Sequence, residues 1–584
     1  MRTPYLSFLL VAVLFAATTV TITARTTAAF TTSRIMPRTG TGGAAGKALN
    51  ACLQLKQKHS RTPTVGMSAA ASPNGRVAVI GAGISGLACS RELKAQGMDV
   101  LLFDTGRLAP GGRCSSKTVV IDGGKTNVLF DHSAQFLSAP ISPSPPSSPS
   151  ATWDKWVREM EAQGILREWD SKSIGILERG GKFIPRASTT TPPQPRALVS
   201  PQGMRAIPTY LAQGLHIDRP KWVSKAKWIP QTDGTGGFWD LWHYQEQLDA
   251  FEYLVIAHNG KCAARLAKSA GEALAPVARL LETKFGASIR GGNTPRYMQL
   301  CSLFVLMVVL DEPVSLPGRE RFEGAFVEGV SELSWVAEQG GKMGQDLGGG
   351  TEGGRAAWVL VSSPGFAEQH KVPQENIPED KAAEVTRLML RAFRQALGMQ
   401  EKGEEGAETS PLVPAASVLQ LWGAGNPISV ADMPQEAPFV FQAATGCGVC
   451  GDWLLAPSIP AAATSGIALA RHIARHHAAK INGDRKVLEE DVGLRCGFKA
   501  VQGARPIASF PGDKAPVVEA VSPKPGRGEG GGGRGGGGGG RGRGGGGGGG
   551  GRGGGGNHSG GRGGGGGKPK KHQQPQQPKK KTNM

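Results

Sequence analysis

Cysteine is scarce in this sequence, and acidic residues are missing from its beginning. Only 8 of the 584 residues are Cys, too few for a disulfide scaffold. No Asp or Glu precedes Glu92, and residues 1–75 contain eight basic residues. Residues 526–584 add six Arg and six Lys against one Glu, so the two ends hold +19 of the formal charge of +20. The overall charge therefore gives no support for a basic groove through the region between them.

Aromatic residues are absent from the C-terminal end, where glycine dominates. Residues 526–567 contain 32 Gly in 42 positions, and residues 526–584 contain no Phe, Trp or Tyr. A segment of this composition cannot build a hydrophobic core, so we expect a disordered basic tail. Gly/Arg segments bind RNA through charge, with aromatic side chains supplying base stacking. Without them we expect at most weak, nonspecific binding to nucleic acid or another anionic surface, and no role in catalysis.

Long apolar runs are also rare, and the clearest lies at the N-terminus. A basic start is followed by an apolar stretch from Leu6 to Ala17 and then by small residues, which predicts a signal peptide over 1–29. The acid-free segment 30–75 has the composition of a transit peptide. Together they resemble the bipartite leaders of algae with secondary plastids, which implies a chloroplast protein with no stable membrane span after leader removal. The alternative is the secretory pathway or a membrane anchor, because Tyr5–Ile22 approaches spanning length.

A dinucleotide-binding motif follows the leader. The apolar run 77–80 predicts a buried strand, a helix is expected from about Ile84 to Gln96, and 100–103 predicts the next strand. In such a unit the glycines permit a tight turn, close approach to a pyrophosphate and close packing, while the helix N-terminus faces the phosphates. An acid at the end of the second strand would bind ribose hydroxyls. The candidate contacts are Gly81, Gly83, Ile84, Ser85, Gly86 and Asp104.

Two further motifs carry a family resemblance. Gly111-Gly112-Arg113 is followed by Phe130-Asp131-His132-Ser133-Ala134-Gln135, and residues 77–139 resemble the N-terminal part of the FAD-dependent amine-oxidase superfamily. Within it they are most similar to the renalase-like branch. The resemblance implies noncovalent FAD, with Gly112 and Arg113 at the pyrophosphate, a role suited to a guanidinium fork. It also places His132 and Gln135 near the flavin, although a purely structural histidine is equally compatible.

Shorter matches extend this resemblance along the chain. Gly203-Met204 is similar to a family segment that precedes a helix, and Val223 matches a valine placed against adenine. The stretch 249–257 is similar to a strand that returns to the Rossmann sheet. Near the end, Asp452 and Ser465 lie in a region that resembles the family's closing motif, where an acid reaches the cofactor and a helix N-terminus faces the flavin. Ser133 and residues 460–462 depart from the residues that the family has at these positions. We therefore expect the surface that faces the substrate to differ in shape from that of the family.

Two features invite sharper claims. Cys447 and Cys450 form a CxxC pair beside the closing motif. Such a pair beside a flavin could act as a dithiol–disulfide relay. A buried strand of small residues explains them better, and zinc would need two more ligands. Some amine oxidases hold a lysine near the flavin, and Lys342 follows a suitable strand. Because it lies in a Gly-rich loop, we do not assign it a catalytic role.

The predicted fold is α/β, with a discontinuous Rossmann-type FAD domain and a mixed β-sheet substrate domain. An amphipathic helix is expected over 381–397. The expected FAD-binding parts are 76–140, 201–285 and 436–500, the substrate parts 153–200 and 286–435, and the linkers 141–152 and 501–525.

We therefore expect an FAD-dependent oxidoreductase that oxidises a small reduced substrate, either an amine or a dihydronicotinamide-type (NAD(P)H-like) ligand. Oxygen or another acceptor would reoxidise the flavin. The alternatives are a plastid carotenoid-desaturase or porphyrinogen-oxidase-like flavoenzyme, which shares the glycine motifs, and an RNA-associated protein that keeps the FAD fold as a scaffold.

Overall fold

The fold is described from a computed structural model. It covers residues 74–501 except 141, 190–194, 233–235, 290–293, 315, 317–320, 346, 348–353, 400–411 and 413. The expected signal peptide, transit peptide and basic tail lie outside the described residues, as does nearly all of the linker 501–525. None of the described helices is long and apolar enough to cross a membrane.

A six-stranded sheet forms the centre of the Rossmann-type part. Its strand order is β10-β2-β1-β14-β23-β22, and every neighbouring pair is parallel except β22 with β23. Apolar residues cover both faces of β1, as expected for a buried parallel strand. The strands span His216–Asp218, Asp99–Phe103, Arg76–Ile80, Tyr253–Ile256, Cys447–Val449 and Val440–Gln442, in that order.

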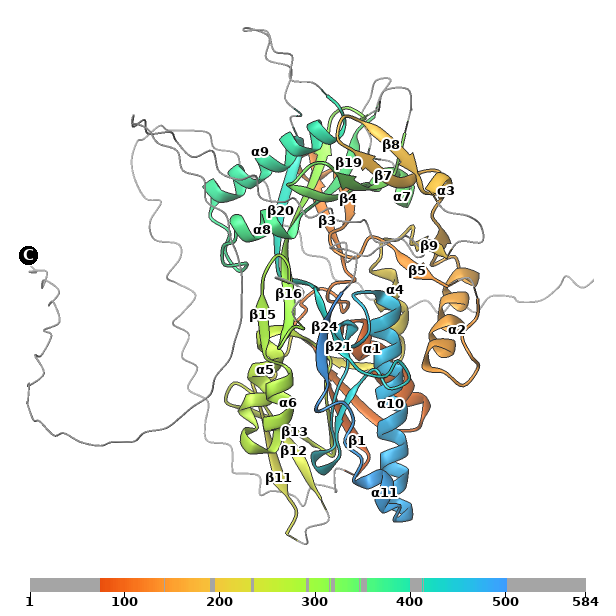
Figure 1. The fold of residues 1–584 in the computed structure, drawn as a ribbon, viewed down its shortest axis with the longest axis vertical. Helices are drawn as coiled ribbons and strands as arrows, with labels where there is room; N and C mark the ends of the chain where they lie inside the picture. Colours follow the sequence, from red (N-terminus) through yellow and green to blue (C-terminus); the bar gives the residue numbers. More distant parts are fainter. Residues whose placement is uncertain are drawn as a thin grey trace, which may run out of the picture. The chain divides into compact units, whose positions relative to one another are not determined.

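Helices cover one face of this sheet (Figure 1). Helix α1 (Ile84–Ala95) crosses α10 (Ile459–Asn482), and the crossing depends on Gly466. A Cβ atom there would lie 2.1 Å from the backbone oxygen of Ser85, so only glycine allows this approach. Helices α2 (Pro149–Ala162) and α4 (Ala206–Leu211) complete the layer. The two ends of the Rossmann-type part, far apart in sequence, thus share one core.

The opposite face packs against a small antiparallel sheet and two helices. Here β11 (Lys225–Pro230), β12 (Gly237–His243) and β13 (Glu246–Phe251) pair in order. Helices α5 (Gly260–Ser269) and α6 (Ala275–Leu280) follow β14. This arrangement places the N-terminus of α5 at the carboxyl ends of the parallel strands.

A larger mixed sheet makes up the second part of the body. Its order is β15-β16-β19-β18-β17-β7-β8, with β20 pairing β16. Helices α8 (Pro364–Gln369) and α9 (Glu379–Ala396) pack on one face through apolar side chains such as Phe366 and Phe393. The strands span Thr283–Phe285, Met298–Leu310, Ala356–Ser362, Leu333–Glu338, Gly324–Glu328, Ile174–Glu178, Lys182–Pro185 and, for β20, Pro414–Pro427.

Shorter elements complete the described part of the chain, with β3–β4, β5-β9-β6 and β21–β24 forming three small sheets. The remaining strands are β3 Ser116–Ile121, β4 Thr126–Asp131, β5 Leu137–Ala139, β6 Arg167–Glu168, β9 Arg196–Val199, β21 Ser429–Asp432 and β24 Gly497–Ala500. The remaining helices are α3 Arg186–Thr189, α7 Gln339–Met343 and α11 Arg485–Leu488. Short 3-10 turns lie at Asp122–Gly124, Gly271–Leu274, Ala443–Thr445 and Asp452–Leu454.

The α/β class, the strand–turn–helix–strand unit and the mixed second sheet confirm the predicted fold, while two local expectations are wrong. Helix α2 begins at Pro149, inside the predicted linker 141–152, because Ser148 caps it and proline is tolerated in the first turn. The stretch 249–257, expected as one strand, is divided at Glu252. Its first half pairs with β12 and its second half pairs with β1.

Acid should destabilise this core through two histidines on α10. Burial lowers the pKa of His472 and of His476 to about 4, below the value of about 6.5 in an unfolded chain. Protonation therefore favours the unfolded state. The contribution of the two histidines to the free energy of unfolding is fully present above pH 6.5 and is lost as the pH falls toward 4. The thermal unfolding midpoint should drop between pH 6.5 and 5, and His472→Leu should make that drop smaller while His476 retains its share. A midpoint that stays constant over this range would contradict the assignment.

Candidate functional site

A cavity of about 300 Å³ opens at the carboxyl ends of the parallel strands. The loops after β1, β2, β14 and β23 line it, together with β20 and the first turn of α10. In an open α/β sheet this edge is where ligands bind.

The glycine loop has the geometry that a phosphate cradle needs. A Cβ atom on Gly86 would lie 2.0 Å from the backbone oxygen of Gly81, so this position requires glycine. On Gly83 a Cβ atom would meet nothing within 4 Å, because this residue faces the cavity. Helix α1 begins directly after Gly83, with no side-chain cap and no acidic residue in its first turn. Its free N–H groups and positive dipole end are thus available to an anion.

Asp104 connects the glycine loop to the turn after β2. Its carboxylate accepts hydrogen bonds from the N–H of Ala82 (3.2 Å) and the N–H of Gly106 (3.0 Å). The N–H of Gly111 donates to the oxygen of Ala82 at 2.8 Å, which brings the GGR turn alongside the first loop. The three loops therefore form one rigid end of the cavity, with Asp104 on its wall.

Arg113 and Asp452, which both line the cavity, form a bidentate ion pair. Both guanidinium-to-carboxylate distances are 2.8 Å, and Arg113 also donates to the oxygen of Gly425 at 3.2 Å. The side chain of Asp452 is 8% exposed and that of Arg113 is 30% exposed. Arg113 thus neutralises a buried carboxylate and keeps donors for a second anion. Since 339 residues separate the two, the sequence motifs implied each of them but not their contact.

Helix α10 directs its N-terminus into the same cavity. Ser458 caps the helix by accepting from the N–H of Ala461, and Pro460 lies in the first turn. Ser458, Pro460 and Ala462 all line the cavity. Ser465 lies deeper, where its hydroxyl accepts from the N–H of Gly451 (3.0 Å) and donates to the oxygen of Pro438 (2.6 Å). It orients the Gly451 turn from behind the wall.

Aromatic rings form the other end of the cavity, where Phe136 and Trp422 line the wall. The imidazole of His132 stacks on Trp422 with ring centroids 5.5 Å apart, and the Trp422 indole N–H donates to the His132 oxygen. Burial lowers the pKa of His132 to about 4, so the ring is neutral at pH 7. Gln135 is buried and donates to the oxygens of Asp131 and Ser133. His132 and Gln135 therefore support the wall from behind.

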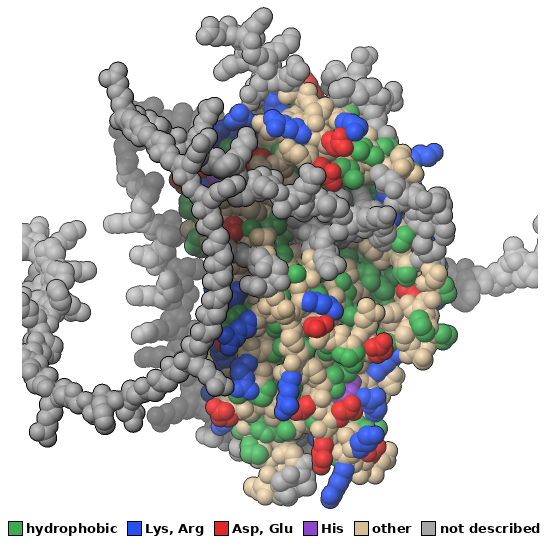
Figure 2. Space-filling model, in the orientation of Figure 1, with side chains coloured by type: hydrophobic (Ala, Val, Ile, Leu, Met, Phe, Trp, Pro, Cys, Tyr) green, Lys and Arg blue, Asp and Glu red, His purple; other side chains and the backbone are tan. Residues whose placement is uncertain are grey.

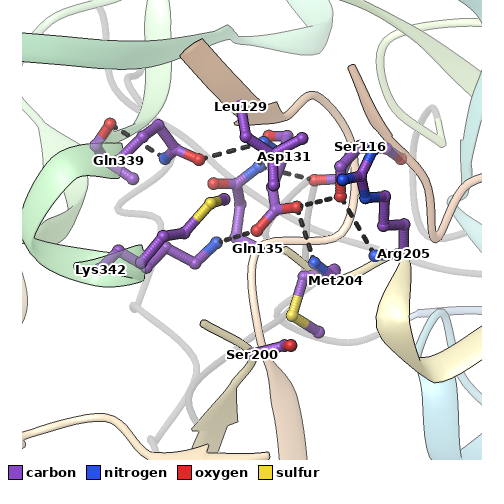
Figure 3. Close-up of polar contacts among 12 residues, drawn as sticks. Ser116, Leu129, Asp131, Gln135, Ser200, Met204, Arg205, Gln339 and Lys342 are labelled. Atoms are coloured by element: carbon purple, nitrogen blue, oxygen red, sulfur yellow. Dashed lines mark hydrogen bonds and ion pairs between the residues drawn. The ribbon is translucent and has the colours of Figure 1, made fainter. Parts of the chain in front are cut away.

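A buried ion pair anchors this wall to the second sheet (Figure 3). The Lys342 ammonium lies 2.7 Å from Oδ2 of Asp131, and both side chains are 0% exposed. The other oxygen of Asp131 accepts from the Ser116 hydroxyl (2.6 Å) and the N–H of Met204 (2.7 Å). Burial lowers the pKa of Lys342, an effect that the Asp131 carboxylate opposes. Gln339 adds a contact by accepting from the N–H of Asp131 at 3.0 Å.

This network gives the Gly203-Met204 motif a structural role and holds Lys342 against Asp131. The turn at Gly203 presents the Met204 N–H to Asp131. Lys342 is not among the residues that line the cavity, and its ammonium is held by a carboxylate. The expected loop position is wrong, because Lys342 lies in the short helix α7, which Glu338 caps. That Lys342 has no catalytic role stays a prediction.

The structure brings most of the sequence-predicted site together. Eight of the proposed contacts lie on the cavity wall: Gly81, Gly83, Ile84, Ser85, Asp104, Gly112, Arg113 and Asp452. Gly86, Ser465, His132 and Gln135 stand behind the wall. Val223 is buried among apolar residues next to β11 and does not line the cavity. Their contacts to a cofactor stay predictions.

The CxxC cysteines do not face each other. Cys447 lies on β23 within the core on one side of the sheet. Cys450 lies in the core on the other side, where it contacts Cys89 of α1 and also lines the cavity. Burial raises the pKa of the Cys447 thiol and that of the Cys89 thiol. Both stay protonated at neutral pH and are poor nucleophiles.

Cys447→Ser and Cys450→Ser should accordingly change turnover little, because no dithiol relay connects the two residues. Steady-state turnover and FAD content of each variant test this. Loss of turnover with FAD still bound would show that the thiols take part in the chemistry.

The residues present fit a dinucleotide whose second half is a flat ring system with polar atoms at its edge. One end of the cavity supplies an uncapped helix N-terminus, an open Gly83 and the donors of Arg113, which suit a pyrophosphate. The far end supplies aromatic surface and a second helix N-terminus. This combination suits a flavin, because aromatic surface packs against its planar ring and a helix N-terminus favours the negative charge that the ring gains on reduction.

Many solved structures match the chain, and three structures of amine-oxidising enzymes are among them. A putrescine oxidase with redesigned cofactor binding is 12% identical, with a TM-score of 0.40, and the match covers 68% of this chain and 98% of that one. For the cyclohexylamine oxidase of Brevibacterium oxydans the values are 12%, 0.39, 69% and 99%. Wild-type putrescine oxidase bound to putrescine gives 13%, 0.36, 68% and 99%. A comparison with curated proteins finds no match.

One family description matches the part of the chain that forms the cavity's glycine loops. Residues 79–149 match the NAD(P)-binding Rossmann-like domain. This range contains α1, β2, the GGR turn and the β3–β4 hairpin. The segment is therefore a Rossmann-like dinucleotide-binding unit, in agreement with its geometry.

Proposed function

We propose that the chain is an FAD-dependent oxidoreductase of the amine-oxidase type that resembles the renalase-like branch. The observation that carries the proposal is the single cavity into which α1 and α10 both direct their N-termini. One helix end suits the pyrophosphate and the other suits the flavin ring. The substrate would be a small amine or a dihydronicotinamide-type molecule, and oxygen or another acceptor would complete the cycle.

When bound, FAD would supply the two-electron acceptor that takes a hydride from the substrate. The protein's contribution is positioning. Gly83 and the first turn of α1 would hold the pyrophosphate, and Asp104 would accept from ribose hydroxyls. The Arg113–Asp452 pair would fix the middle of the cofactor without leaving a net charge in the cavity.

The far end of the cavity would receive the substrate. Phe136 and Trp422 would exclude water there once substrate is bound, and the neutral His132 ring stacks on Trp422. No proton transfer is assigned to His132, because the ring stands behind Trp422 and is not among the residues that line the cavity. The binding energy of a planar substrate would come mainly from the aromatic wall.

Anaerobic reduction of the bound flavin tests this function. The FAD-loaded protein should bleach with amines or reduced nicotinamides, and Trp422→Ala should slow the bleaching while FAD stays bound. Bleaching by porphyrinogens alone would instead support the desaturase or porphyrinogen-oxidase alternative. Absence of bleaching with all three classes, in protein that dithionite can reduce, would contradict the proposal.

A further inference from the structure

Basic side chains gather on the surface over α5 and β15 (Figure 2). Residues 257–300 contain seven Lys or Arg and two acidic residues. The near-neutral overall charge of the body had argued against such a feature, but an average conceals local clustering. We call the surface the Phe285 patch. Its members are Lys261, Lys284, Phe285, Arg296, Tyr297 and Lys371.

Two aromatic rings organise the four cations of the patch. The ammonium groups of Lys261 and Lys371 lie 5.5 and 4.7 Å from the ring centroid of Phe285. Lys284 and Arg296 lie 5.2 and 5.9 Å from that of Tyr297. Lys284 and Phe285 are successive residues of the edge strand β15, so the two clusters flank that edge of the sheet from its two faces.

The nearby carboxylates offset only part of the charge of the patch, because Glu282 has its own cation and Glu368 alone adds an unpaired negative charge beside the four cations. Glu282 pairs with Lys268 at 3.1 Å, and Glu368 accepts from the N–H of Ala287 at 3.1 Å. Within the described part of the chain, none of the four patch cations forms an ion pair. Protection of the edge strand β15 by a lysine would explain Lys284. It does not explain Lys261 on a helix or Lys371 in a loop.

The patch adjoins the rim of the cavity. Lys261 follows Asn259, a lining residue, by two positions. On the other side, Gln374 accepts from the N–H of Gly423 at 2.9 Å, and Gly423 stands between two lining residues, Trp422 and Ala424. Lys371 lies three positions before Gln374. A partner on the patch would therefore sit beside the opening.

We propose that the Phe285 patch docks a protein with an acidic face, a one-electron carrier that reoxidises the flavin. The proposal rests on the function proposed above. Two oxidised carriers, each gaining one electron, would reoxidise one hydride-reduced flavin, which would release one proton to solvent; the second proton of the cycle leaves the substrate when it gives up the hydride. A protein fits better than single-stranded nucleic acid, because bases would compete with two cations already placed at each ring.

The test uses the full-length FAD-loaded protein and two small carriers of opposite charge, acidic cytochrome b5 and basic cytochrome c. The patch variant is K261E/K284E/R296E/K371E. The matched control, K125E/R158E/K227E/K486E, reverses four exposed charges elsewhere on the body. Binding is measured at low and high salt, and anaerobic electron transfer from photoreduced flavin is followed by stopped flow.

We expect the patch variant to lose about tenfold or more in affinity for cytochrome b5 at low salt, with a parallel fall in electron-transfer rate. The control variant should change far less, and high salt should remove the difference. Equal losses in both variants, or no binding of cytochrome b5 by the wild type, would overturn the proposal. So would a patch variant that loses binding of a uridine oligonucleotide but keeps cytochrome b5. Binding does not need flavin, so a protein that takes up no FAD would refute the proposed function separately.

Discussion

Lys342→Met is expected to lower the free energy of unfolding by about 3–5 kcal/mol, the typical loss when one member of a buried ion pair is removed. The substitution leaves the Asp131 carboxylate at 0% exposure without its cation. The Ser116 hydroxyl and the Met204 N–H would remain as donors and offset part of this loss. Urea unfolding followed by tryptophan fluorescence measures the change.

Two variants separate the buried charge from a general effect of losing a lysine. The double variant D131N/K342M removes both charges and keeps an oxygen acceptor for Ser116, so it should be more stable than K342M. Lys182→Met breaks an exposed pair with Glu178 at 2.9 Å and should cost at most about 1 kcal/mol. A K342M protein as stable as K182M would show that the pair is not a structural anchor.

Arg113→Ala is expected to weaken FAD binding about ten- to a hundredfold, because a charge-assisted hydrogen bond contributes about 1.5–3 kcal/mol. The variant loses donors to the cofactor and also leaves Asp452 as an unpaired, nearly buried anion beside the phosphates. Titration of the apoprotein with FAD, followed by quenching of flavin fluorescence, measures the affinity.

Asp452→Asn provides the matched control. It removes the negative charge while keeping an acceptor for Arg113, so its affinity should fall much less than that of Arg113→Ala. The double variant R113A/D452N should bind FAD more tightly than R113A. If R113A binds FAD like the wild type, the guanidinium serves only to neutralise Asp452 and the pyrophosphate role is wrong.

The Rossmann unit could be predicted from sequence because its parts are local. The first strand, the glycine turn, α1 and Asp104 follow one another within about thirty residues, and each has a pattern with a physical meaning. The GGR and closing motifs were found through resemblance, and the structure places Arg113 and Asp452 on one cavity wall.

Contacts between distant residues could not be predicted in this way. Lys342 and Asp131 are 211 residues apart, and Lys342 lies in a Gly-rich stretch whose pattern indicates only a loop. The Phe285 patch draws its cations from separate elements, so the summed charge gave no sign of it. Helix α2 was overlooked because prolines and serines before Trp153 suggested a linker, although Ser148 and Pro149 are typical of a helix start.

The central claim is that this cavity holds noncovalent FAD, and the cofactor released from the purified protein tests it most directly. After acid precipitation the supernatant should contain a yellow compound with the mass and absorption spectrum of FAD, in near-equimolar amount. The pellet should be colourless. Release of NAD or NADP would contradict the account, as would a protein that stays colourless after refolding with excess FAD.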